Sequence, residues 1–427
     1  MKLSSGLAAA AFFGLALSAP AHRPKFMRSR ENSAGMLSLD VTRRETPVSV
    51  STLKAAMLAQ MNADIGNKSS LDDSLFTVDL MNQITHYSVN IGIGTNNKQY
   101  PLLIDTGSSD FWVSNSTDIV DIPYDYASDK SKTLTTKPFH IDYVKGSMDG
   151  FWAKNTMYFG SRIDDVDYAI VHKGVDSPKI RQSSGILGTS YSYRGNKNLP
   201  ELLAYQGLIN KNAYSLSLAN FNGSNGNLLF GGVDHSKYTG DLVTVPRADF
   251  ENSRLKTLSA KLTSLNIDGK SYTINGDKGI VAPLDTGTTL SYLPSDIYNQ
   301  LASAFGVNSV NTLVYGAPCF DVSKYGDKEV TFNFTGALIK VKGSDLALDF
   351  KDYTGVDQGN MNIFGIWSNT YTRGYNILGD TFLRSAYIVY DLDGNTISLA
   401  QANRNPGAPD IEVIYDDIPG AISVSEL

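Results

Sequence analysis

Two aspartates, Asp105 and Asp285, each follow an apolar run and are each followed by threonine and glycine. A single triplet of this kind is ordinary turn chemistry, because it arises by chance about once in several thousand residues. The second copy stands 180 positions after the first, and an Ile-Leu-Gly follows each copy, ending at Gly188 and Gly379. The repeated order indicates an internal duplication in which each half supplies one carboxylate to a shared site.

Two carboxylates that lie close together cannot both ionise cheaply, so one keeps a proton and the pair titrates as a unit. Such a pair can hold a water molecule between its oxygens. The charged member takes a proton from that water, while the protonated member polarises a substrate carbonyl. This chemistry hydrolyses an amide and requires neither a metal nor a covalent intermediate.

The residues that follow the two aspartates suit this task. They are Thr106, Gly107, Ser108, Thr286, Gly287 and Thr288. The threonines at the second position can bond across the junction of two loops, and the glycines allow tight turns that direct N–H groups toward the carboxylates. The hydroxyls of Ser108 and Thr288 can each donate to an outer carboxylate oxygen. Ordinary turn capping is the alternative role for all these hydroxyls.

The elements that must position these residues are predicted to be mostly strands. Short alternating runs such as "HYSVNIGIG", "EVTFNF", "ALIKVKG" and "AYIVYDLDGNTISLA" are typical of β structure. Helical signals are few: "NLPELLAYQGLI", and "LPSDIYNQLASAFG", which Ser295 can cap and in which Ile297, Leu301 and Phe305 share one face. A hydrophobic fraction of 42% is ample for large cores. The sequence therefore predicts an all-β protein of two similar lobes.

The N-terminal residues predict targeting and processing. Residues 1–21 combine a lysine, an apolar stretch and small residues, which is typical of a secretory signal peptide. A membrane anchor is the alternative, but the apolar stretch is short for one. Residues 22–44 contain six Lys or Arg against two acids, which indicates either a solvated linker or a propeptide with a dibasic processing site at Arg43 and Arg44.

The charge balance bears on partners. Without residues 1–44 the chain keeps 30 basic and 41 acidic residues, so its net charge changes from −6 to about −11. A detachable basic leader suits the masking of an acidic cleft. Because no basic stripe remains, nucleic acid is not an expected partner.

The chain has a single cysteine, Cys319, so it cannot form an internal disulfide and a buried, inert thiol is expected. Sequons at Asn115, Asn222 and Asn333 are compatible with secretion, although each is a common chance match.

These motifs resemble the pepsin-like aspartic proteases, and more closely their secreted fungal members. The stretches that carry the resemblance are "IDTGSSDFWVSNS", "LDTGTTLSYLP", "SGILGTS", "LLFGGVD" and "NILGDTFLRSAYIVYDLDGNTISLAQ", and it extends over roughly residues 76–403. It implies a bilobal all-β fold with few short helices and a cleft between the lobes. It also implies that Asp105 and Asp285 are the catalytic dyad.

The resemblance further implies a β-hairpin flap where "FHIDYVKGSMDG" stands. The implied flap and substrate residues are Tyr143, Lys145, Gly146, Ser147 and Trp112, the last as the hydrogen-bond partner of the flap tyrosine. An ordinary strand tyrosine is the alternative for Tyr143. If Lys145 lies near the side chain that precedes the scissile bond, it disfavours Lys or Arg there and favours an apolar residue packed against Tyr143 and Phe151; the alternative is that Lys145 points into solvent.

As a whole, the resemblance implies a secreted aspartic endopeptidase that is made as a zymogen and works at acid pH as a monomer. Its expected partners are protein or peptide substrates, its own propeptide and pepstatin-like inhibitors; no cofactor, metal or membrane anchor is expected. The vacuole or the cell wall are alternative locations. The predicted segments are a signal peptide (1–21), a propeptide (22–44, with an alternative end at about 75), an N-terminal lobe (76–248), a C-terminal lobe (249–405) and a tail (406–427).

Two departures and two alternatives accompany this interpretation. The family's usual disulfides are absent, and Pro283 predicts a bulge or a sheet edge just before Asp285. A non-catalytic binding or inhibitor protein on the same fold is one alternative, but such chains typically lose an aspartate, a glycine or the flap tyrosine. The second alternative is a hydrolase of another class. The chain has neither H-E-x-x-H, the motif of zinc proteases, nor G-x-S-x-G, the motif around a nucleophilic serine.

Overall fold

A computed structural model gives the fold. It describes residues 37–44, 86–143, 146–159, 162–175, 180, 182–218, 225–251, 253, 255–276, 278–307, 313–314, 317–351 and 357–424. The predicted signal peptide, most of the predicted propeptide and the residues around its alternative limit near residue 75 therefore lie outside the described residues.

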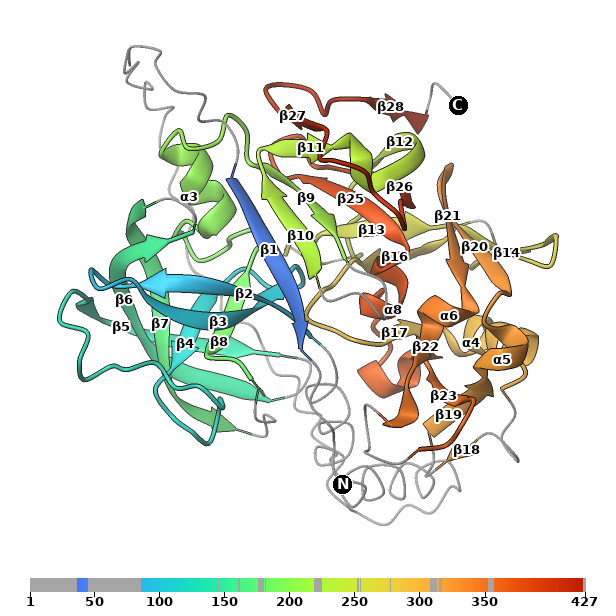
Figure 1. Ribbon diagram of the computed structural model, residues 1–427, viewed down its shortest axis with the longest axis horizontal. Helices are drawn as coiled ribbons and strands as arrows, with labels where there is room; N and C mark the ends of the chain where they lie inside the picture. The colour runs from blue at the N-terminus through green and yellow to red at the C-terminus, as the bar shows by residue number, and fades with distance from the viewer. Residues whose placement is uncertain are drawn as a thin grey trace, which may run out of the picture. The chain divides into compact units, whose positions relative to one another are not determined.

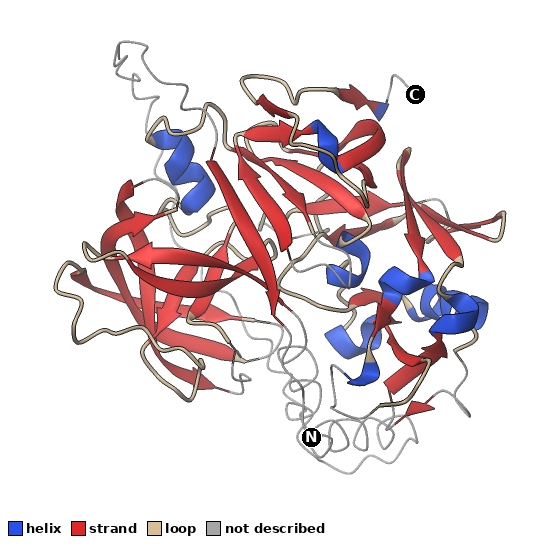
Figure 2. Ribbon diagram, viewed as in Figure 1, coloured by secondary structure: helices blue, strands red, loops and turns tan. Residues whose placement is uncertain are grey.

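Strands dominate the described residues, and the helices are short (Figure 2). The elements up to residue 246 are β1 (Leu37–Arg44), β2 (His86–Ile93), β3 (Lys98–Asp105), β4 (Phe111–Ser114), β5 (Thr133–Asp142), β6 (Ser147–Tyr158), β7 (Arg162–Val175), β8 (Gly185–Gly188), α3 (Leu199–Tyr205), β9 (Ala213–Ser217), β10 (Asn225–Phe230), β11 (Gly232–Asp234), η1 (His235–Lys237) and β12 (Tyr238–Pro246).

The later elements continue the pattern. They are β13 (Ser259–Leu262), β14 (Ser264–Ile267), β15 (Lys270–Thr273), β16 (Ile280–Pro283), β17 (Ser291–Leu293), α4 (Ser295–Ala304), β18 (Leu313–Val314), β19 (Ala317–Asp321), α5 (Val322–Tyr325), β20 (Glu329–Phe334), β21 (Ala337–Lys342), α6 (Gly343–Leu346), β22 (Ala347–Leu348), β23 (Met361–Phe364), β24 (Ile366–Ser368), η2 (Asn369–Thr372), α8 (Asp380–Leu383), β25 (Ala386–Asp391), β26 (Thr396–Ala402), β27 (Ile411–Val413) and β28 (Ala421–Ser423). The predicted mostly-β architecture is confirmed.

The alternating runs became strands because alternate side chains point to opposite faces of a sheet. In β20 and β21 every second residue is buried, and the two strands form an antiparallel hairpin that pairs Phe334 with Ala337. Strand β25 is buried along its whole length, as expected for a strand covered on both faces.

One sheet connects both halves of the sequence. Among the described residues its strand order is β28-β12-β26-β25-β9-β10-β1-β2-β3-β8-β4-β7-β6-β5. Strand β1 lies between β10 and β2 and pairs antiparallel with both (Figure 1). Because β9 pairs with β25, and β12 with β26, strands on both sides of the predicted lobe boundary at residue 248 share this sheet.

The tail also joins the sheet structure. Strand β27 pairs with β11, and β28 adds to the outer side of β12 in parallel. The remaining strands of the second half form smaller sheets, among them β15-β14-β20-β21 and β18-β19-β23-β22.

One local prediction was wrong, and for another the structure decides between two expected alternatives. Helix α4 begins at Ser295, but its N-cap is Pro294, and no side chain caps the first turn. The Ser295 hydroxyl bonds the Ser368 hydroxyl instead, at 2.7 Å, so a tertiary contact replaces the expected cap. Pro283 is the last residue of β16, which pairs only with β13 among the described strands, so it stands at an edge.

The core is apolar and continuous over much of the described chain. Its largest cluster contains residues from the first and the second half, including Tyr87 and Phe382, both fully buried. Cys319 is fully buried in a smaller cluster with Tyr292 and Trp367. Within the described residues, no helix is both long enough and apolar enough to cross a membrane.

Candidate active site

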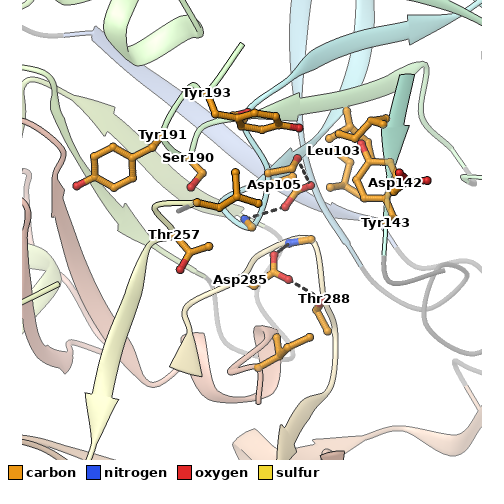
Figure 3. Close-up of a pocket in the computed structure, with 18 of the residues that line it drawn as sticks. Leu103, Asp105, Asp142, Tyr143, Ser190, Tyr191, Tyr193, Thr257, Asp285 and Thr288 are labelled. Carbon is orange, nitrogen blue, oxygen red and sulfur yellow. Dashed lines mark hydrogen bonds between the residues drawn. The ribbon is translucent and has the colours of Figure 1, made fainter. Parts of the chain in front are cut away.

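The structure brings the two predicted aspartates together in one cleft (Figure 3). Asp105 is the last residue of β3, and Asp285 follows β16 by two positions. The cleft has a volume of about 310 Å³, and both carboxylates line it. Asp105 is buried and Asp285 is half-buried.

The threonines of the two triplets bond reciprocally. The Thr106 N–H donates to the Thr286 hydroxyl at 3.1 Å, and the Thr286 N–H donates to the Thr106 hydroxyl at 3.0 Å. Each hydroxyl donates in turn to a carbonyl of the opposite half, that of Leu284 at 2.6 Å and that of Ile104 at 2.7 Å. Because all four bonds are buried, they are not weakened by competition with water.

The Asp105 carboxylate accepts two hydrogen bonds from its own loop. The Gly107 N–H donates to one oxygen at 2.8 Å, and the Ser108 hydroxyl donates to the other at 2.5 Å. Burial is the main cause that raises the pKa of Asp105, and the neighbouring Asp285 carboxylate raises it further. The bonds from Ser108 and Gly107 act in the opposite direction but do not cancel the shift.

The second half repeats this pattern. The Asp285 carboxylate accepts from the Gly287 N–H at 2.8 Å and from the Thr288 hydroxyl at 2.6 Å. Each glycine also lies against the opposite carboxylate: a Cβ on Gly107 would stand 2.5 Å from an Asp285 oxygen, and one on Gly287 would stand 2.5 Å from an Asp105 oxygen. Only glycine lets the two carboxylates approach so closely.

The Ile-Leu-Gly segments support the two aspartate loops. In the first half, β8 runs parallel to β3 and places Gly188 beside Asp105. In the second half, the Asp285 N–H donates to the Leu378 carbonyl at 2.9 Å. A Cβ on Gly188 would lie 2.5 Å from the Asp110 nitrogen, and one on Gly379 would lie 2.2 Å from the Thr288 carbonyl oxygen. This close packing accounts for the second repeated motif.

The hairpin of β5 and β6 carries Tyr143 over the cleft. The Tyr143 N–H donates to the Gly146 carbonyl at 3.0 Å, and Gly146 has a φ of 77°, which closes the turn. The Trp112 indole N–H donates to the Tyr143 hydroxyl at 2.7 Å. Ser147 begins β6. Lys145 lies outside the described residues.

The apolar wall near Tyr143 is different from the one predicted. Phe151 does not line the cleft; it packs against Tyr126 and His172, because it faces the opposite side of its strand. The apolar residues that line the cleft are Leu103, Ile141, Met148, Ile180, Ile186, Leu255 and Ile377.

Other lining residues had no sequence signal. They include Tyr191, Tyr193, Lys256 and Thr257, and Figure 3 shows Tyr191 and Thr257 away from Tyr143. They come from separate loops that no motif connects.

The predicted modification sites differ in their surroundings. Asn115 is exposed. Asn333 is half-buried; its amide donates to the Ser264 hydroxyl at 3.3 Å and accepts from the Gly336 N–H at 2.7 Å. Asn222 lies outside the described residues.

The predicted processing residues, Arg43 and Arg44, are the last two residues of strand β1. Among the described residues, no group of three or more His, Cys, Asp or Glu could hold a metal ion.

Comparison with known proteins is consistent with this site. A family model described as eukaryotic aspartyl protease matches residues 86–402. Secreted aspartic protease 3 of Candida albicans is 36% identical over 348 residues, covering 76% of this chain and 81% of that protein. Candidapepsin of Candida tropicalis is 34% identical over 344 residues, covering 75% of this chain and 80% of that protein.

A solved structure gives the fold independently. The aspartic proteinase from Irpex lacteus matches with a TM-score of 0.61 at 23% identity, covering 74% of this chain and 94% of that one. This likeness confirms the predicted bilobal all-β fold class.

The raised pKa of Asp105 predicts a pH-dependent difference in stability. Between the ordinary value of 3.8 and the raised pKa, the native state holds a proton that the unfolded chain has released, so stability falls as pH rises. Asp105→Asn has no such proton. We expect its free energy of unfolding to exceed that of the wild type by roughly 1–4 kcal/mol above the raised pKa and by less in acid. Denaturant unfolding of both proteins, from acid pH to above the raised pKa, measures the difference between their free energies of unfolding. A difference that does not change with pH contradicts the prediction.

Proposed function

The chain belongs to the eukaryotic aspartyl protease family and is an aspartic-type endopeptidase, and on that premise we propose that it cleaves peptide bonds with Asp105 and Asp285 as its catalytic dyad. The observation that carries this proposal is the symmetric pair of carboxylates, each bonded by its own loop and each in contact with the other half's glycine.

In the proposed reaction the dyad shares one proton. The charged carboxylate removes a proton from a water molecule held between the two side chains, and the protonated one donates to the carbonyl oxygen of the scissile bond. The oxygen of the water bonds to the carbonyl carbon, which gives a tetrahedral intermediate with two hydroxyl groups. The carboxyl that took the water proton then gives it to the nitrogen, the C–N bond breaks and the amine leaves, and a hydroxyl of the intermediate returns a proton to the other carboxylate. The bonds from Ser108 and Thr288 fix the outer oxygens, so that the inner oxygens face the substrate.

The proposed substrate is an extended protein or peptide segment with apolar residues near the cut. Leu103, Ile141 and Met148 offer apolar surface beside Tyr143, and burial of such surface favours a hydrophobic side chain. An influence of Lys145 on this preference stays a prediction.

The proposed zymogen form contains residues 22–44 as its propeptide. Strand β1 supports this proposal, because a cut after Arg44 would leave an eight-residue strand paired with β10 and β2 but no longer covalently joined to β2. Secretion is proposed because relatives in the family are named as secreted proteases, and a monomer inhibited by pepstatin-like compounds is the proposed state.

The dyad is tested by substitution. We expect Asp105→Asn and Asp285→Asn each to lower kcat/KM by about 10²–10⁴-fold or more, because each removes one partner of the proton transfer. The substrates are two octapeptides that differ only in the residue before the cut, Leu or Lys, assayed at acid pH. We expect the wild type to give the higher kcat/KM with the Leu peptide. Asp241→Asn, at an exposed carboxylate of β12, is the control and retains full activity. A folded dyad variant with substantial activity would refute the assignment.

Processing is tested on the secreted protein. We expect a mature N-terminus at Glu45, produced by a dibasic-specific protease, or one before about residue 76, produced by self-cleavage. Edman sequencing of the wild type and of Arg43→Gln/Arg44→Gln separates the two routes, because only the first is blocked by the substitutions. A mature, active enzyme that still contains Arg23 to Arg30 overturns both.

The two described sequons are expected to differ in occupancy. A glycan fits Asn115, which is exposed, whereas one on Asn333 would attach to the half-buried nitrogen that donates to the Ser264 hydroxyl. Glycosidase treatment followed by mass spectrometry, with Asn115→Gln as the comparison, measures occupancy. Glycan found mainly on Asn333 is the contrary result.

A further inference from the structure

The flap hairpin has a second attachment besides Tyr143. Strand β5 is an edge strand of its sheet, so its outer side has no neighbouring strand among the described residues. Because the Tyr143 N–H bonds the Gly146 carbonyl, the alternation of an antiparallel ladder turns the backbone groups of His140 toward this outer edge. The carbonyl of His140 accepts a hydrogen bond there from Arg194, at 2.6 Å.

The guanidinium of Arg194 makes three hydrogen bonds at once. Besides the bond to His140, its Nε donates to an Asp110 carboxylate oxygen at 2.8 Å, and its Nη2 donates to the Tyr193 hydroxyl at 2.8 Å. The Arg194 side chain is 24% exposed and that of Asp110 is 2% exposed. The guanidinium also lies over the rings of Tyr193 and Phe139, at 4.8 and 5.6 Å. This planar fork of donors is a property that lysine does not share.

Asp110 ties this cluster to the catalytic loop. It lies five residues after Asp105, and its carbonyl accepts from the Gly188 N–H at 3.0 Å. Two residues further on, Trp112 bonds Tyr143 directly. One short stretch of chain therefore holds the flap at two points, through Trp112 and through Arg194.

Burial and charge make this second attachment specific for a cation. Burial raises the pKa of the Asp110 carboxyl, while Arg194 and, more weakly, Lys137 lower it. A neutral residue at position 194 would leave a buried carboxylate without its cation, which is costly.

We propose that Arg194 is a positioning residue that holds the flap, and with it the cleft-lining residues Ile141, Asp142 and Tyr193, in register with the Asp105 loop. The role in substrate binding rests on the proposed function, whereas the effect on the flap does not. Since the contacts of Arg194 exist before substrate binds, their loss raises KM and leaves kcat nearly unchanged.

Hydrogen exchange tests the effect on the flap without any need for activity. The proteins are compared in an Asp105→Asn background, which prevents self-digestion if the dyad is catalytic. We expect Arg194→Ala to exchange the ladder-protected amides of Ile141 and Tyr143 about tenfold faster or more, because a charge-assisted bond is lost. Arg194→Ala/Asp110→Asn removes the unpaired carboxylate, keeps the protein foldable and shows the same acceleration. Arg162→Ala, at an exposed arginine paired with Asp164 at 3.0 Å, is the matched control and changes nothing.

Kinetics test the effect on substrate in the active background. For an octapeptide we expect KM about tenfold higher in Arg194→Ala, with kcat within about twofold, and only partial rescue by Arg194→Lys. Folded Arg194 variants whose flap exchange and KM equal those of the wild type overturn the inference. A wild type that cleaves no peptide overturns the proposed function instead, and the exchange result still decides the role of Arg194.

Discussion

The reciprocal bonds between Thr106 and Thr286 are the constraint on which the site depends. They join two loops that are 180 residues apart and leave no space for a side chain at the following glycines. Two carboxylates are thereby held in contact although their charges repel, and the pair reduces the repulsion by keeping a proton. The proposed acid–base chemistry thus depends on packing, since the raised pKa of Asp105 is a consequence of burial and of its neighbour.

The long sheet makes this junction possible. Strands β25 and β26 from the second half lie between β12 on one side and β9 and β10 on the other, all from the first half, so neither half completes the sheet alone. Buried backbone groups need partners, and each half supplies them for the other. Strand β1 shares this environment, which connects the proposed propeptide to the sheet and places it beside β2, the strand that pairs with β3.

The stretch from Asp105 to Ser114 combines several roles. It carries one carboxylate, the hydroxyl that orients it, and the two residues, Asp110 and Trp112, that reach the flap directly or through Arg194. Glycine at position 188 lets the supporting strand approach this stretch closely. The hairpin is therefore attached at two points to the same stretch of chain that carries Asp105, so the proposed substrate binding and the proposed chemistry share one support.

The sequence by itself determined the strands and the pairing of the aspartates, because alternation reports which face is buried and a duplicated motif reports a shared site. It wrongly predicted that Ser295 caps α4 and that Phe151 lines the cleft. The bond from Ser295 to Ser368 and the face of the strand to which Phe151 points both depend on residues that are distant in the sequence. The contact of Arg194 with Asp110 joins positions 84 residues apart and has no motif. Only the tertiary structure decided such contacts, because local sequence sets which groups are buried, whereas the packing of remote segments sets which buried groups meet.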